Sequence, residues 1–127
     1  MNNNFSTVTK YDEDNIFAKI IRKEIPSEII YENDNVLCFK DINPRTPHHI
    51  LIIPKGQYKD MTDFSLNASD KEILSLIKTI GKIAGKLGIE ENGYRLISNT
   101  GVDGRQEVPH LHIHLMGGRD VGRMTSI

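Results

Sequence analysis

Residues 110–116 of the 127-residue chain read His110-Leu111-His112-Ile113-His114-Leu115-Met116, and this stretch decides the fold. Its polar and apolar residues alternate with a period of two, so an extended strand would place the three imidazoles on one face and the apolar side chains on the other. Alternate side chains along a strand lie about 6.6 Å apart. The pattern predicts a strand over 108–116 that packs on a core and carries three histidines into one pocket.

Histidines at this spacing suit chemistry at a single phosphoryl group. A neutral imidazole attacks phosphorus, while a neighbouring imidazole donates to an oxygen or protonates a leaving amine near neutral pH. Histidines two apart on a strand also coordinate zinc, usually together with a ligand from another segment. His48 and His49 are the candidates for that further ligand. The residues alone therefore leave a metal site and ordinary strand histidines as alternatives to a phosphoryl-transfer site.

The loop before the histidines, residues 99–106, combines glycines with the amide side chains of Asn99 and Gln106. Glycine permits close approach of a ligand to the backbone, and amide groups donate to phosphate oxygens. Taken alone, such a loop is more often a simple turn. Because it directly precedes the histidines, we predict that it forms an anion cradle beside them.

The other segments predict an α+β domain. A short amphipathic helix is expected over 14–22, and a second, long helix over 69–88, between a capping box of Ser69 and Glu72 and the stop at Gly88. Strands are expected at 28–32, 36–40, 49–53, 93–98 and 108–116, with the first two forming a hairpin. The helical periodicity and the strand pattern place Ile77 and Leu96 in the main core.

Length and composition limit the chain to one ordinary domain with one core, since 38% of the residues are hydrophobic. Residues 1–13 are polar and aperiodic and predict a flexible leader, followed by a single domain over 14–127. A net charge of −1 argues against nucleic-acid or membrane partners. With a single cysteine, Cys38, and no long apolar run, the expected location is the cytoplasm.

Four stretches together resemble the histidine triad superfamily. They are residues 16–26, 39–44, 49–55 and 110–116, and the following Gly117-Gly118-Arg119 is similar to the nucleotide-binding phosphoramidase branch. The resemblance covers the chain from Asp14 to about Arg119, in the right order. It implies a five-stranded antiparallel sheet with two helices, continued across a homodimer.

The same resemblance implies a function: hydrolysis of nucleoside 5′-phosphoramidates, of adenosine type, through a nucleotidyl-histidine, with no metal or other cofactor. His112 would be the nucleophile and His114 a phosphate partner, while His110 and His49 complete the polar cluster. Asn99 and Gln106 would hold the phosphate, and Asp41 would accept hydrogen bonds from the ribose of a purine nucleotide. The base would lie against Ile16, Phe17, Ile20 and Ile42, although from the residues alone ordinary core is the simpler interpretation of these apolar side chains.

Two positions depart from the animal type of the family. Glu107 stands in place of a serine that donates to phosphate, and Arg105 stands in place of glycine. Glu107 is included in the expected substrate site, although the alternation leaves open which side of the strand it faces. Alternative functions are a dinucleoside polyphosphate hydrolase, a nucleotidyl transferase, or a non-catalytic, nucleotide-responsive protein-interaction module.

Overall fold

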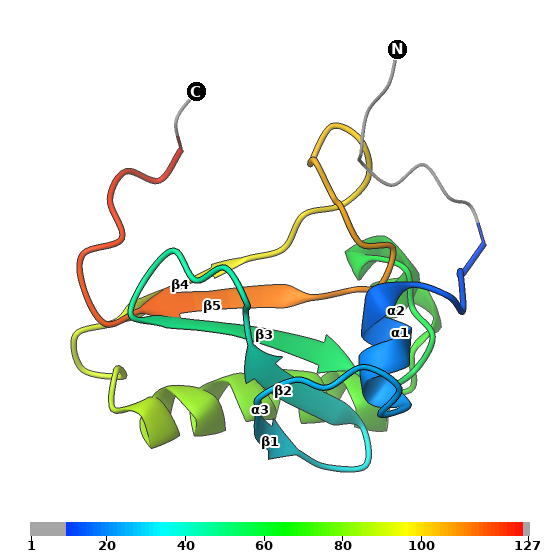
Figure 1. Cartoon of the computed structure of the whole chain (residues 1–127), viewed down its shortest axis with the longest axis horizontal. Coiled ribbons are helices and arrows are strands. Elements are labelled where there is room, and N and C mark those ends of the chain that lie inside the picture. Colours follow the sequence, from blue (N-terminus) through cyan, green and yellow to red (C-terminus); the bar gives the residue numbers. More distant parts are fainter. Residues whose placement is uncertain (1–9, 126–127) are drawn as a thin grey trace.

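A computed structural model describes residues 10–125 of the chain, which form one five-stranded antiparallel sheet and three helices (Figure 1). The strands lie in the order β1-β2-β3-β5-β4. Their bounds are Ile29–Glu32 for β1, Val36–Lys40 for β2, His48–Pro54 for β3, Tyr94–Ile97 for β4 and Ile113–Gly117 for β5. The helices are α1, Ile16–Ile21, α2, Met61–Asn67, and α3, Asp70–Leu87. The predicted α+β class and five-stranded antiparallel sheet are confirmed.

The predicted number of two helices is wrong, because α2 was missed. This helix begins after Asp60, whose side chain accepts a hydrogen bond from the Asp63 amide, and it buries only Phe64. Seven residues are too few to show a repeating apolar face, so hydrophobic periodicity gives no signal here. The carboxylate cap before Met61 was the available clue.

The histidine stretch is extended as a ladder only from Ile113 onward, so the predicted strand over 108–116 begins five residues late. Pro109 has no N–H to donate, which prevents regular pairing at this point. The Leu111 amide instead bonds to the carbonyl of Tyr58, outside the sheet. His110 therefore lies outside the regular strand and is fully buried.

Helix α3 has the predicted ends, with a complete capping box at Ser69 and Gly88 in the left-handed conformation. It lies along one face of the sheet, as Figure 1 shows, and buries Leu76, Ile80 and Ile83. Ile77 is 59% exposed and Leu96, on the edge strand β4, is 43% exposed. Their predicted places in the main core are wrong, because a helix on a single sheet buries a narrower face than its apolar spacing implies.

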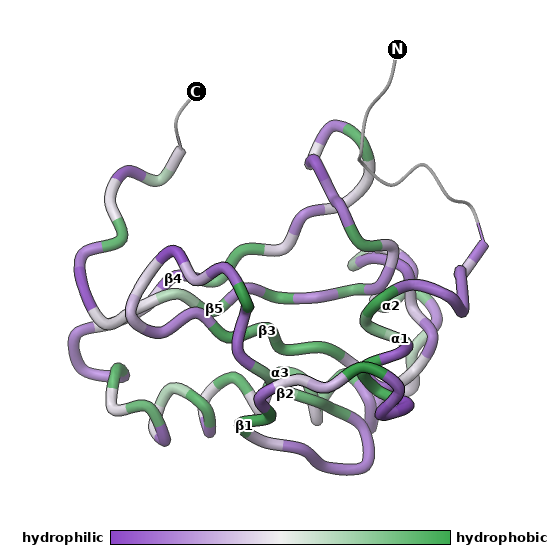
Figure 2. The backbone as a smooth tube through the Cα atoms, in the orientation of Figure 1, coloured by the Kyte–Doolittle hydropathy of each residue, from purple (hydrophilic) through white to green (hydrophobic). Residues whose placement is uncertain are grey.

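The neighbouring strands β2 and β3 separate two apolar clusters. Val36 and Ile52 belong to the cluster under α3, whereas Leu37 and Leu51 belong to the cluster that packs against α1. All of residues 49–53, where a strand was predicted, are buried in β3. In Figure 2, β2 and β3 are mostly hydrophobic, whereas the turn that joins β1 to β2 is polar.

Most of the predicted leader, residues 1–13, falls outside the described residues. Residues 10–13 of the leader are described. Within them, Tyr11 contacts His110, and the main-chain carbonyl of Glu13 accepts a hydrogen bond from Arg22. Within residues 10–125 no helix is long and apolar enough to cross a membrane. Continuation of the sheet across a dimer stays a prediction.

Candidate functional site

A cavity of about 510 Å³ opens where the loops after β2 and β4 meet the histidines. It brings together nine of the residues that the sequence placed in the site: Ile16, Phe17, Asp41, Ile42, His49, Asn99, Glu107, His112 and His114. Three others, namely His110, Gln106 and Ile20, are buried and do not line it. The start of α1, strands β2 and β3, the loop 99–107 and the start of β5 thus converge on one space.

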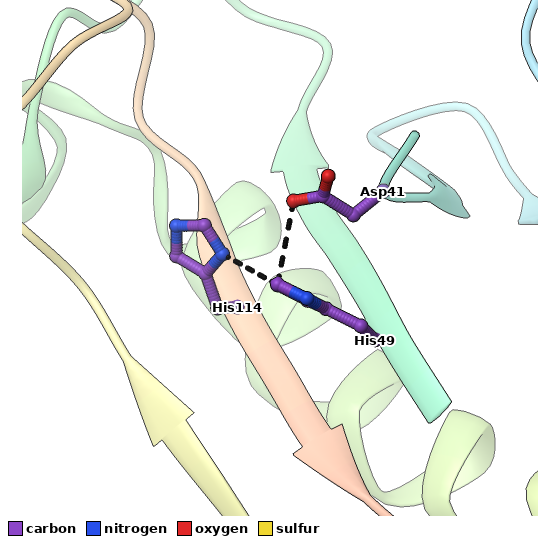
Figure 3. A group of neighbouring side chains, drawn as sticks. All are labelled: Asp41, His49 and His114. Atoms are coloured by element: carbon purple, nitrogen blue, oxygen red, sulfur yellow. Dashed lines mark hydrogen bonds and ion pairs between the residues drawn. The ribbon is translucent and has the colours of Figure 1, made fainter. Parts of the chain in front are cut away.

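His49 and His114 lie on the adjacent strands β3 and β5, and their imidazole rings are hydrogen-bonded to each other (Figure 3). His49 Nε2 is 2.9 Å from His114 Nδ1 and 3.3 Å from a carboxylate oxygen of Asp41. The Arg45 amide donates to His49 Nδ1 at 3.1 Å, so the proton of a neutral His49 is on Nε2. His49 therefore donates to His114 Nδ1, which leaves the N–H of a neutral His114 on Nε2.

The charge state of this pair follows from burial. Burial lowers the pKa of His49, partly offset by the Asp41 carboxylate and reinforced by the Arg45 guanidinium. Burial also lowers the pKa of His114 to about 4, helped by His112 and His49. Both rings are neutral near pH 7, and His114 is a hydrogen-bond donor rather than a cation.

His112 is held by the main chain. Its Nδ1 donates to the carbonyl of His110 at 2.7 Å, so Nε2 is without a proton and available as a nucleophile. Burial lowers the pKa of His112, which keeps the imidazole neutral. The ring lies edge-on to Phe17, with centroids 4.9 Å apart, and 5.2 Å from the ring of His114.

The His110 side chain is buried in the interior and does not line the cavity. Its Nε2 donates to the Pro54 carbonyl at 2.8 Å, and burial lowers its pKa to about 4. The hydroxyl of Tyr11 lies 2.6 Å from its Nδ1. Sequence reasoning missed Tyr11, because an isolated aromatic residue in a polar segment gives no signal of a contact 99 residues away.

The two amide side chains of the loop before the histidines, Asn99 and Gln106, make different contacts. Asn99 lines the cavity, whereas the amide of Gln106 is used inside the loop: it accepts from the Gly101 amide and donates to the carbonyls of Lys59 and Val108. The predicted phosphate contact of Gln106 is replaced by a role in holding the loop. The loop is tight, because a Cβ at Gly104 would meet the carbonyl oxygen of Thr100.

Charged residues at the end of this loop face the cavity. Arg105 lines it from a left-handed backbone with φ of 60°, a conformation that favours the glycine of the animal type. Glu107 also lines it, and its carboxylate acts to raise the pKa of His112, against the larger effect of burial. The side of the strand that Glu107 faces, left open by the sequence, is therefore the cavity side.

The apolar residues expected around a base are split between cavity and core. Ile16, Phe17 and Ile42 line the cavity, and Ile42 is 87% exposed. Ile20 instead packs with Leu37 in the core beneath α1. For Ile20 the simpler interpretation, ordinary core, holds.

One set of side chains within residues 10–125 has the proximity that a metal ion requires. Asp41, His49 and His114 each offer a ligand atom, and these atoms lie within 4.8 Å of one another. His110 and His112 do not belong to this set. A metal site built from the three alternating histidines is thus replaced by one that shares only His114 with them.

Fold and site define a class of small α+β proteins in which neutral histidines on or beside the adjacent strands β3 and β5 meet at one cavity. The HIT domain model matches residues 22–121, and the chain belongs to the HIT domain family. It is 52% identical to an uncharacterised 13.2 kDa HIT-like protein of Azospirillum brasilense over 116 residues, 91% of this chain and 95% of the relative.

Two further relatives carry more descriptive names. The purine nucleoside phosphoramidase of Escherichia coli is 49% identical over 114 residues, which cover 90% of this chain and 95% of that enzyme. A solved structure of a HIT family hydrolase from Clostridium thermocellum is 46% identical and superimposes with a TM-score of 0.80 over 88% of this chain and 96% of that one.

Proposed function

We propose that the protein hydrolyses purine nucleoside 5′-phosphoramidates through a nucleotidyl-histidine on His112. The observation that carries the proposal is the His112 ring, whose bonded Nδ1 leaves Nε2 free at the cavity. The similarity to the Escherichia coli purine nucleoside phosphoramidase supports the same reaction class. No cofactor is needed for this chemistry.

The nucleotide would lie along the cavity with its base against Ile16, Phe17 and Ile42. Asp41 stands between this apolar wall and the histidines, and its carboxylate, which accepts from the Asn43 amide and lies 3.3 Å from His49 Nε2, has lone pairs left for ribose hydroxyls. Asn99 would donate to the phosphate from the opposite loop.

The reaction would proceed in two displacements. His112 Nε2 attacks phosphorus, the bond from phosphorus to nitrogen breaks, and the leaving amine departs with a proton taken from the medium or a cavity group. His114 Nε2–H donates to a non-bridging oxygen as negative charge develops on it. A water molecule then attacks the nucleotidyl-histidine, which yields the nucleoside monophosphate and returns His112 to its neutral state.

The test is intact-protein mass spectrometry after a rapid acid quench during turnover of adenosine 5′-phosphoramidate. We expect one added adenylate on a peptide that contains His112. Turnover without any adduct, even with a slowly hydrolysed substrate, would contradict the covalent route. Dinucleoside polyphosphates tested in parallel would reveal the alternative hydrolase or transferase, and nucleotide binding without turnover would indicate an interaction module.

The Asp41, His49 and His114 set favours one second candidate, a metal-assisted hydrolase. A metal there would occupy His114 Nδ1 and polarise a phosphate oxygen from that position. Prolonged dialysis against a chelator distinguishes the two routes. Full activity after dialysis is expected for histidine catalysis, and activity that is lost and then restored by zinc would favour the metal.

We also propose the homodimer that the family resemblance implies. The edge strand β4 leaves Tyr94 and Leu96 exposed, and its outer edge has no partner strand within residues 10–125. Pairing of two copies at this edge would extend the sheet. Light scattering at micromolar concentration should give twice the 14.4 kDa chain mass, and a monomer mass would exclude this assembly.

A further inference from the structure

Tyr11 lies outside the cavity, yet among residues 10–125 it makes the shortest hydrogen bond to any of the imidazole rings. Its hydroxyl is 2.6 Å from His110 Nδ1, and the two rings meet edge-on with centroids 5.5 Å apart. The side chain is half-buried, and burial raises the pKa of its phenol. The hydroxyl therefore keeps its proton at neutral pH and is able to donate.

The direction of this bond is determined by the other ring nitrogen of His110. Pro54 offers a carbonyl oxygen, which accepts only, so the proton of the neutral ring is on Nε2. Nδ1 is then an acceptor, and Tyr11 is the donor that it meets. Because His110 is fully buried, loss of that hydroxyl would leave an acceptor without a partner in the interior.

His110 connects Tyr11 to the nucleophile. The carbonyl of His110 accepts from His112 Nδ1, and Phe17 lies edge-on to both imidazoles. Once His112 carries a nucleotidyl group, its ring is positively charged, and the bond from Nδ1–H to that carbonyl becomes stronger. A small rotation at His110 would thus be felt most in the covalent step.

We propose that Tyr11 is a positioning residue for His112, and that it acts by clamping the ring of His110 against the Pro54 carbonyl. The inference rests on the proposed function, because it assigns Tyr11 a role in formation of the nucleotidyl-histidine. It also gives a role to part of a segment that precedes the HIT domain match at residues 22–121.

The main test is Tyr11→Phe in the full chain, which keeps the ring and removes the donor. The single-turnover rate of adduct formation should fall about 3- to 10-fold, the range that one neutral hydrogen bond is worth. The dissociation constant for adenosine monophosphate should stay within about twofold, because Tyr11 is not part of the cavity lining. The matched control is Tyr31→Phe, which removes a hydroxyl that accepts from the Asn33 side-chain amide at 3.3 Å and should leave both quantities unchanged.

An unchanged rate of adduct formation in Tyr11→Phe would overturn the proposal. So would weaker nucleotide binding with a normal rate, because that result belongs to a structural role. If the unaltered protein forms no adduct, the proposed function fails, and NMR spectra of the ligand-free protein decide the contact independently. The His112 ring resonances should shift in Tyr11→Phe and not in Tyr31→Phe, and resonances that stay in place in both variants would also overturn it.

Discussion

The site contains two bonded pairs of histidines, and they differ in what surrounds them. The outer pair, His49 and His114, is joined ring to ring and touches the Asp41 carboxylate beside the cavity. The inner pair, His110 and His112, is held by main-chain carbonyls and by Tyr11. A ring bonded to another ring and a carboxylate has several places for a proton, whereas a ring bonded to a carbonyl has one.

This difference separates two tasks that imidazole can perform. The inner pair fixes a single tautomer and leaves one nitrogen of His112 permanently free for attack. The outer pair places an N–H donor beside it, and the carboxylate of Asp41 stabilises any positive charge that the pair acquires. Under the proposed function, the same residue type would thus be a nucleophile in one pair and a donor in the other, according to its partners.

Removal of the nucleophile should give the largest effect. His112→Ala should nearly abolish turnover and yield no covalent adduct, because no neighbouring ring has a free nitrogen in the same place. Nucleoside monophosphate should still bind, since Asn99 and the apolar wall remain. The measurements are single-turnover kinetics, quenched mass spectrometry and calorimetric binding. Adduct formation by His112→Ala would erase the distinction between the two pairs.

A change in the outer pair should slow the reaction without removing its covalent route. His114→Ala deletes the Nε2–H donor, and loss of such a group typically costs about 10² to 10⁴ in rate. The variant should still form the nucleotidyl-histidine, slowly, when followed by the same quenched mass spectrometry. If adducts were absent over long incubations, His114 rather than His112 would be the candidate nucleophile.

The sequence predicted most of the residues that line the cavity, but not the hydrogen bonds that hold His110 and His112 in place. Alternation correctly brought His112 and His114 to one cavity, because both lie at or next to the regular part of β5. It misplaced His110, since Pro109 interrupts the ladder and the backbone turns inward there. Local patterns carry no information on a turn whose direction is set by Tyr58 and Pro54, which are about 50 residues away in sequence.

Helices show the same limit. The ends of α3 were predictable because Ser69, Glu72 and Gly88 act locally, through caps. The buried face was not, since the spacing that includes Ile77 does not reveal where the sheet ends beneath the helix. Gln106 is a similar case: an amide in a glycine-containing loop bonds to loop carbonyls as readily as to a ligand, and only the fold decides between the two.

Acid should lower the stability of the fold through each histidine whose pKa is lowered, and His110 isolates the contribution of the inner pair. The pKa of His110 is lowered to about 4 from an ordinary value near 6.5, so the unfolded chain binds this proton first as pH falls. Stability is therefore lost between about pH 6.5 and 4, by up to roughly 3 kcal/mol for this one group. Urea midpoints of the unaltered protein and of His110→Gln, measured from pH 7 to 4.5, should converge toward low pH. Parallel curves would show that His110 titrates normally.

The smallest effect should come from Glu107, an exposed carboxylate that lines the cavity near His112. Its negative charge opposes an incoming phosphate, but solvent screens it, and exposed charge pairs are worth about 0.2 to 1 kcal/mol. Glu107→Ser should accordingly tighten binding of adenosine monophosphate by at most about fivefold, with the gain shrinking as salt is added.

Arg45→Gln provides the opposite case, because the Arg45 guanidinium lowers the pKa of His49 and His114 by its charge. Its loss should weaken nucleotide binding and raise both of those pKa values in an NMR titration, whereas Glu107→Ser should lower the pKa of His112. Weaker binding by Glu107→Ser would mean that the carboxylate organises a donor on the same loop, and Arg105 would then be the residue to test. The charge of Arg45 acts on the pKa values of the outer pair, and the charge of Glu107 acts on the pKa of His112. If the two variants shift these values separately, the division between inner and outer histidines extends to the charged residues around them.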